Sequence, residues 1–323
     1  MIRISRGACA LLACMFAGCA TPQTPIAMPD QSHATGPLGI KGDLLYVDEG
    51  YRTRQSESGR VAIYTYPDLK LVEKFTVSKP GAPPAGTTGM CSDAQGDVFI
   101  GGDYDQNAAI YEYAHGGTAP IAVLNDGAYD ANDCAVDGIT GNLAVVNYVT
   151  GNTSANVSIF QNAQGNPTIY TDPGMVNYLS CTYDDNGNLF VDGTTSTATQ
   201  IVELPAGSST FTSIALNVTL GSTGAVLWRK GLLVIQDQAV RKLYSVRLSG
   251  SSGTVVATTR VRQKGPSGEL DYIYNDRVIA PDGNHLAGGQ VGIWPYPAGG
   301  HPITVFSTGN VVNPYSATIS AKQ

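Results

Sequence analysis

Residues 132–147 read NDCAVDGITGNLAVVN, which is a short apolar strand ending in Asp, a turn closed by Gly-Asn, and a second apolar strand. The same pattern occurs before it, at residues 90–100, and after it, at residues 180–192. Its turn glycines recur every 44 to 46 residues, at Gly96, Gly141, Gly187 and Gly231. A four-stranded unit repeated at this period is typical of a β-propeller. The sequence therefore predicts an all-β fold built from four-stranded blades.

Six such units fit residues 38–323, which we predict to form one six-bladed domain. The first unit lacks an inner strand, because residues 44–77 supply only the three outer ones. Residues 314–320, PYSATIS, have the character of an inner strand, and no further strand pattern follows them. We therefore predict that the C-terminal strand completes the first blade and closes the ring, which would leave no sheet edge open.

Charged residues make up 14% of the chain and the formal net charge is −7. Ordinary soluble domains have roughly 25% charged residues. A chain of negative net charge without a basic stripe offers little to neutralise phosphates, so nucleic acid is excluded as an expected partner.

The cysteines divide into two groups of three. Cys9, Cys14 and Cys19 lie near the N-terminus, whereas Cys91, Cys134 and Cys181 occupy matching positions in successive units. We expect matching positions in neighbouring blades to lie farther apart than the ~5.5–6 Å Cα separation of a disulfide. The sequence thus predicts three unpaired cysteines that fill gaps between blades. The alternative is a metal site formed by the three thiols.

The N-terminal segment indicates export. Residues 1–18 contain two arginines, then an apolar run and small residues, the pattern of a secretory signal peptide. The stretch FAGC, which ends at Cys19, resembles the lipobox of bacterial lipoproteins. That resemblance implies acylation of Cys19, and Ala20 after it implies sorting to the outer membrane. An ordinary signal peptide cleaved nearby is the alternative. Residues 19–37 are rich in Pro, Ser, Thr and Gln, which predicts a disordered tether.

Propeller geometry separates the short turns from the long loops, and the long-loop face is the expected binding face. In each unit the second strand, counted from the axis, is called strand b. It ends on that face in a residue whose side chain carries an oxygen. These residues are Asp48, Asp103, Asn147, Asp192, Asp237 and Asp282. If they converge on the axis they form a candidate Ca²⁺ site, because hard cations prefer oxygen donors. The alternative is that each accepts hydrogen bonds from nearby loop amides. No other cofactor is predicted.

The repeat resembles the NHL and YVTN type of six-bladed propeller, whose unit reads Pro-x-Gly-(apolar)-Ala-x-Asp-x-x-Gly-x-(aromatic)-Val. The resemblance covers nearly all of residues 38–323 and implies a fold rather than a chemistry. The lipobox followed by YPAGG-type blades also looks like exported bacterial propeller lipoproteins of no assigned activity. Gluconolactonase-like propellers hold a metal through a Glu-Gly-Pro phrase, which does not occur here. Virginiamycin-lyase-like propellers need channel histidines, and only His285 lies in a suitable loop.

The sequence therefore predicts a monomeric, non-catalytic binding or scaffold module of the bacterial cell envelope. Its expected partner is an envelope protein or a small ligand on the long-loop face, and its only membrane contact is the lipid on Cys19. The alternative function is that of a metal-dependent, lactonase-like hydrolase of the gluconolactonase type, acting at the channel.

Overall fold

The computed structural model describes residues 40–48, 59–78, 86–104, 107–127, 131–148, 155–262, 270–282, 289–307 and 314–322. The predicted signal peptide (1–18), the tether (19–37) and Cys19 lie outside these residues. Within the described ranges the only helix is the short 3-10 turn η1, Gln161–Ala163. No helix there is long and apolar enough to cross a membrane.

The strands form antiparallel sheets in which chain order runs from the inside outward, with one exception at the first sheet. That sheet has the order β24 (Ala317–Ser320), β1 (Leu44–Asp48), β2 (Arg60–Thr65), β3 (Leu71–Thr76). The next two are β4 (Gly86–Ser92), β5 (Val98–Tyr104), β6 (Asn107–Tyr113), β7 (Ala122–Asn125), and then β8 (Ala131–Val136), β9 (Leu143–Asn147), β10 (Asn156–Phe160), β11 (Thr168–Tyr170).

Two four-stranded runs are joined into one eight-stranded sheet. The first run is β12 (Asn177–Tyr183), β13 (Leu189–Thr194), β14 (Thr199–Leu204), β15 (Thr212–Leu216). The second is β16 (Val226–Arg229), β17 (Leu232–Asp237), β18 (Lys242–Ser249), β19 (Ser252–Arg260). Only a short parallel pairing of the outer strands β15 and β19 joins them. The last sheet is β20 (Tyr272–Tyr274), β21 (Arg277–Asp282), β22 (Gln290–Pro295), β23 (Thr304–Ser307).

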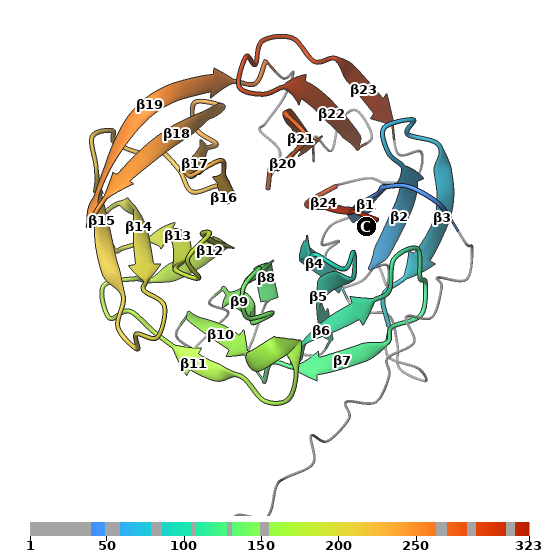
Figure 1. Ribbon diagram of the computed structural model, residues 1–323, viewed down its shortest axis with the longest axis horizontal. Coiled ribbons are helices and arrows are strands. Elements are labelled where there is room, and N and C mark those ends of the chain that lie inside the picture. The colour runs from blue at the N-terminus through green and yellow to red at the C-terminus, as the bar shows by residue number, and fades with distance from the viewer. Residues whose placement is uncertain are drawn as a thin grey trace, which may run out of the picture. The chain divides into compact units, whose positions relative to one another are not determined.

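The innermost strands surround a common axis (Figure 1). Following the ring, β24 contacts β4, which is followed by β8, β12, β16 and β20, and β20 contacts β24 again. The sheets radiate from this inner ring, so the arrangement is propeller-like. The glycines that set the sequence period lie in the turns after the inner strands, and Gly96, Gly141, Gly187 and Gly231 all have φ between 71° and 90°. Glycine adopts this conformation without steric strain, which explains the recurrence.

The predicted closure by the C-terminal strand is confirmed. β24 pairs with β1 in antiparallel register from Leu44 opposite Ser320 to Val47 opposite Ala317. Side chains also join β24 to the next blade, because Ser92 Oγ of β4 donates to the Ile319 carbonyl at 2.8 Å. The last strand therefore completes one sheet and ties it to its neighbour.

The core lies between the faces of adjacent sheets. A strand enclosed on both faces is largely apolar, and every residue of β1 and of β9 is buried, including the terminal Asp48 and Asn147. Outer strands have one face in water, so β3 alternates between exposed and more buried positions. The apolar runs of the sequence thus mark the second strand of a sheet, counted from the axis, and the alternating runs mark its outermost strand.

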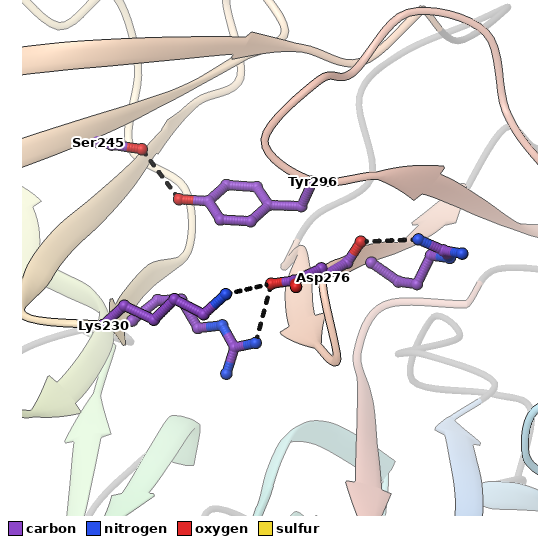
Figure 2. Close-up of polar contacts among 6 residues, drawn as sticks. Lys230, Ser245, Asp276 and Tyr296 are labelled. Carbon is purple, nitrogen blue, oxygen red and sulfur yellow. Dashed lines mark hydrogen bonds and ion pairs between the residues drawn. The ribbon is translucent and has the colours of Figure 1, made fainter.

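Polar contacts join the β16–β19 run to the β20–β23 sheet (Figure 2). Asp276 Oδ1 lies 2.9 Å from Lys230 Nζ and 3.1 Å from Arg229 Nη2. These two cations hold the pKa of Asp276 below its usual range, with the Lys230 hydrogen bond contributing most. Tyr296 and Ser245 share a hydrogen bond of 2.9 Å. Exposed ion pairs contribute only about 0–1 kcal/mol, so packing between the sheets provides most of the stability.

Candidate functional site

A cavity of about 210 Å³ lies among the inner strands, and each of the six contributes to its lining, directly or through the residues just before it. The polar side chains that reach it come from β4, β8, β12 and β20; they include Ser92, Asp133, Ser180, Thr182, Asp271 and Tyr272. Aromatic and aliphatic groups complete the wall, among them Trp228, Leu227 and Ile273. No lysine, arginine or histidine of the described residues lines it. The cavity is therefore small, mixed in polarity and acidic.

Asp133, on β8, is one of the two carboxyl groups at the cavity. Its Oδ2 accepts a 2.6 Å hydrogen bond from Ser180 Oγ and a longer one, 3.4 Å, from the Cys181 amide. Ser180 Oγ in turn accepts from the Val226 amide at 3.0 Å. Burial raises the pKa of Asp133 to about 7 even though these hydrogen bonds lower it. One chain of hydrogen bonds thus runs across three inner strands and ends at this carboxyl group.

Asp271, just before β20, is the second carboxyl group. It is 5% exposed, and its Oδ1 has no hydrogen-bond partner. Burial alone raises the pKa of Asp271 to about 8. Its backbone amide is anchored to Gln236 Oε1 at 3.2 Å, which fixes the residue at the cavity wall. A buried polar group without a partner requires an explanation, since most such groups in folded proteins are satisfied.

Sequence reasoning missed both aspartates. It considered the oxygen-bearing residues that end the second strand of each unit. The aspartates that directly follow the inner strands are turn residues. Asp93 Oδ1 accepts from two amides of its own turn, and Asp184 Oδ1 does the same. The signal for Asp133 was present, because it directly precedes Cys134 where the matching units have Met90 and Ser180. The recognisable pattern is an acidic residue in one inner strand at a position where the matching strands have an uncharged residue.

The predicted ring of strand-b oxygens is partly described. Asp48, Asn147, Asp192 and Asp237 are each at most 1% exposed. Asp103 and Asp282 are placed by their backbone alone, in β5 and at the end of β21. Within the described ranges, no three His, Cys, Asp or Glu side chains form a group that could hold a metal ion. The six-residue Ca²⁺ site stays a prediction.

The described carboxylates of this set accept hydrogen bonds from backbone amides in the segments just before inner strands. Asp48 Oδ1 accepts from the amides of Tyr315 and Ser316, at 2.9 and 2.8 Å. Asp192 Oδ2 accepts from Gly224 at 2.8 Å, and Asp237 Oδ2 from Gly221 at 2.9 Å. These contacts are those expected of loop-capping residues, the alternative that the sequence left open.

Asn147 belongs to a separate buried polar group. Its Nδ2 donates to Asn156 Oδ1 at 2.8 Å and to Ser158 Oγ at 3.0 Å, both on the neighbouring strand β10. Asp126 is buried nearby, and burial raises its pKa while Ser158 and Asn147 lower it. Asn147 therefore connects β9 to β10 within their own sheet.

The prediction of three unpaired cysteines was wrong. Cys91 and Cys134 form a disulfide whose Cα atoms are 5.5 Å apart. Matching positions lie this close because they are on the inner strands β4 and β8, which contact each other where the blades converge on the axis. Cys181, on β12, is the one free cysteine of the described residues, and burial followed by the Asp133 charge raises the pKa of its thiol. The disulfide also rules out the three-thiol metal site.

Loss of the disulfide should lower the free energy of unfolding by about 4 kcal/mol, because the bond closes a loop 43 residues long in sequence separation. Urea unfolding of the Cys91→Ser/Cys134→Ser variant, compared with wild type, measures this. Wild type with a reducing agent should match the double variant, and the Cys181→Ala control should keep the full response to reduction. Equal stability of reduced and oxidised wild type would contradict the prediction.

His285 and several of the predicted long loops, among them residues 49–58, 149–154 and 263–269, lie outside the described residues. The expectation that the long-loop face binds a partner therefore stays a prediction.

Comparisons with known proteins agree with the fold and add no activity. No family model matches the chain, and no curated protein does. A chain in the crystal structure of a nidogen/laminin complex is similar, with a TM-score of 0.66 and 12% identity over 88% of this chain and 100% of that one. The crystal structure of a protein from Lactobacillus plantarum is similar with a TM-score of 0.55 and 9% identity, over 86% and 99%. Identities this low bear on the fold alone. These two structural similarities and the arrangement of the sheets around an axis show that this chain is a β-propeller.

Proposed function

We propose that this chain is an exported, lipid-anchored propeller of the NHL and YVTN type that works as a non-catalytic ligand-binding module of the bacterial cell envelope. The observation that carries the proposal is the axial cavity, whose wall presents Asp271 with an unpartnered oxygen. Concave sites with few convergent polar groups are the usual form of small-molecule sites. A small ligand in the cavity is thus favoured over an envelope protein on the long-loop face.

We count six blades, taking the eight-stranded sheet as two. The two runs in that sheet each have four antiparallel strands, and only two residue pairs join β15 to β19. Six inner strands in the described ranges follow one another around the axis, which agrees with this count. The ring is closed within one chain, so the proposed state is a monomer.

Export is supported by the disulfide. Disulfides persist in oxidising compartments such as the bacterial periplasm and are rare in the reducing cytosol. The Cys91–Cys134 bond is therefore in keeping with the signal peptide and the lipobox-like stretch before residue 20.

Binding is favoured over hydrolysis by the state of the nucleophilic side chains at the cavity. A serine or cysteine nucleophile needs a base or a lowered pKa to become reactive. Burial raises the pKa of the Cys181 thiol, so this thiol is not activated. Ser180 Oγ is already engaged on both sides, because it donates a hydrogen bond to Asp133 and accepts one from the Val226 amide. The competing function, a lactonase-like hydrolase, requires Ca²⁺-dependent turnover of a lactone by the purified protein. Such turnover would overturn the proposal.

Anchoring is tested through Cys19. Cys19→Ser should either leave the signal peptide uncleaved or move the protein from the membrane fraction to the soluble fraction of lysed cells, because the lipid on Cys19 is the expected anchor of the processed chain. Cys14→Ser, in the same leader, is the matched control and should leave the protein in the membrane fraction. A Cys19→Ser chain that is processed to the wild-type size and still remains in the membrane fraction would contradict the lipoprotein assignment.

A further inference from the structure

We propose that the axial cavity binds a short organic diammonium ion, with one ammonium group at Asp271 and the other at Asp133. This inference rests on the ligand-binding function proposed above and names its ligand class. Asp271 stands at β20 and Asp133 on β8, which lie on opposite sides of the inner ring in the order given by the strand contacts. The two acids thus face one cavity from opposite walls.

The first argument is charge. Two carboxyl groups line the cavity, and no basic side chain of the described residues lines it with them. Arg229 and Lys230, at the end of β16 and just after it, are engaged with Asp276 at 3.1 and 2.9 Å. A buried carboxylate is stable only when it is paired or neutralised. A cation in the cavity would pair with the Asp271 carboxylate and so replace a proton as the group that neutralises it.

The second argument distinguishes an organic cation from a metal ion. Ca²⁺ takes six to eight oxygen ligands. Asp133 Oδ2 already accepts from Ser180, and no cluster of three His, Cys, Asp or Glu occurs among the described residues. Trp228 and Tyr272 line the same cavity, and aromatic faces attract organic ammonium groups. A hydrocarbon linker would meet Leu227 and Ile273. This lining suits an amine with an aliphatic chain better than it suits a bare ion.

The third argument is size. The cavity of about 210 Å³ is smaller than the ~300–1,000 Å³ of sites for drug-sized ligands. A four-carbon diamine is therefore a suitable probe, and 1,4-diaminobutane is the one we choose.

The experiment is a calorimetric titration of the full chain, purified in detergent, with 1,4-diaminobutane in phosphate buffer at pH 8. We expect saturable binding of one molecule per chain, followed independently by Trp228 fluorescence. Asp271→Asn and Asp133→Asn should each weaken binding at least tenfold. Asp276→Asn, an exposed acid outside the cavity, should leave the affinity unchanged. 1-Aminobutane, which has the same carbon chain and one charge, should bind at least tenfold more weakly.

Proton release gives a second readout. From pH 6 to pH 8.5 binding should strengthen and release fewer protons per ligand, because the aspartates lose their protons without the ligand's help. The other titratable groups lining the cavity are Cys181, Tyr183 and Tyr272, whose pKa values burial raises further above this range. Only Asp133 and Asp271 therefore change charge there.

Absence of saturable binding, or binding that both Asn variants leave intact, would overturn the diammonium assignment. Near-ultraviolet circular dichroism shows whether each variant is folded, and the two variants are independent of each other. Binding of Ca²⁺ alone that depends on Asp271 would also overturn the diammonium ligand while leaving a ligand-binding cavity. Lactone turnover, in contrast, would overturn the proposed function itself. The two failures are thus distinguishable.

Discussion

Removal of residues 314–323 should abolish cooperative folding rather than fray one edge of the protein. The deletion takes away β24, in which Ala317, Thr318, Ile319 and Ser320 are all at most 3% exposed. Truncating a single buried Ile to Ala costs about 2–5 kcal/mol, and domains of this kind have a total stability of about 5–15 kcal/mol. Losing the whole strand should exceed what the fold can tolerate, and it would expose β1 as an unpaired apolar edge.

Circular dichroism during heating measures this effect. The full chain should show one sharp transition, and the truncated chain should show a broad transition or aggregation. A chain that ends at Ala321 is the matched control, because it keeps β24 and loses only the last two residues. It should melt within a few degrees of the full chain. A sharp transition at the full-length temperature in the long deletion would place the closure of the ring elsewhere.

Stability should fall by several kcal/mol as pH rises from about 4 to about 8, and Asp271 should account for much of the loss. Its folded-state pKa of about 8 lies above the ordinary value of 3.8. The folded state therefore holds a proton that the unfolded chain releases, so its contribution is complete below about pH 4 and is lost as pH rises through 8. At 1.36 kcal/mol per pKa unit, the loss is about 6 kcal/mol at most. Asp133, with a pKa raised to about 7, acts in the same direction.

Urea unfolding of wild type and Asp271→Asn across this pH range provides the test, in a buffer free of amines. The variant should equal wild type near pH 4 and exceed it near pH 8, since the amide carries no charge to bury. Asp276→Asn is a control of opposite sign, because Lys230 and Arg229 lower that pKa. Its effect should appear above about pH 4 and vanish in acid. If Asp271→Asn leaves the slope unchanged, Asp271 does not hold the proton.

The strand pattern and the closure could be read from the sequence because both depend on local residue order. Asp before a turn glycine, and apolar runs of fixed spacing, specify strands wherever the chain goes. Contacts toward the axis depend on how far apart two inner strands come to lie, and residue order does not contain that distance. The Cys91–Cys134 bond was missed for this reason. The partners of Asp48 were missed because the sequence does not show which backbone amides a side chain reaches, even where the two segments are expected to pair.

The pairing of β1 with β24 also sets the earliest moment at which this protein can exist in its closed form. β1 is made early in synthesis and can pair with β24 only after the end of the chain has been made. At about 5–20 residues per second, the chain between Asp48 and Ala317 takes roughly 15–50 s to be made. Throughout that interval the apolar strand β1 lacks its inner partner. The ring therefore cannot close before the chain has been made as far as Ser320.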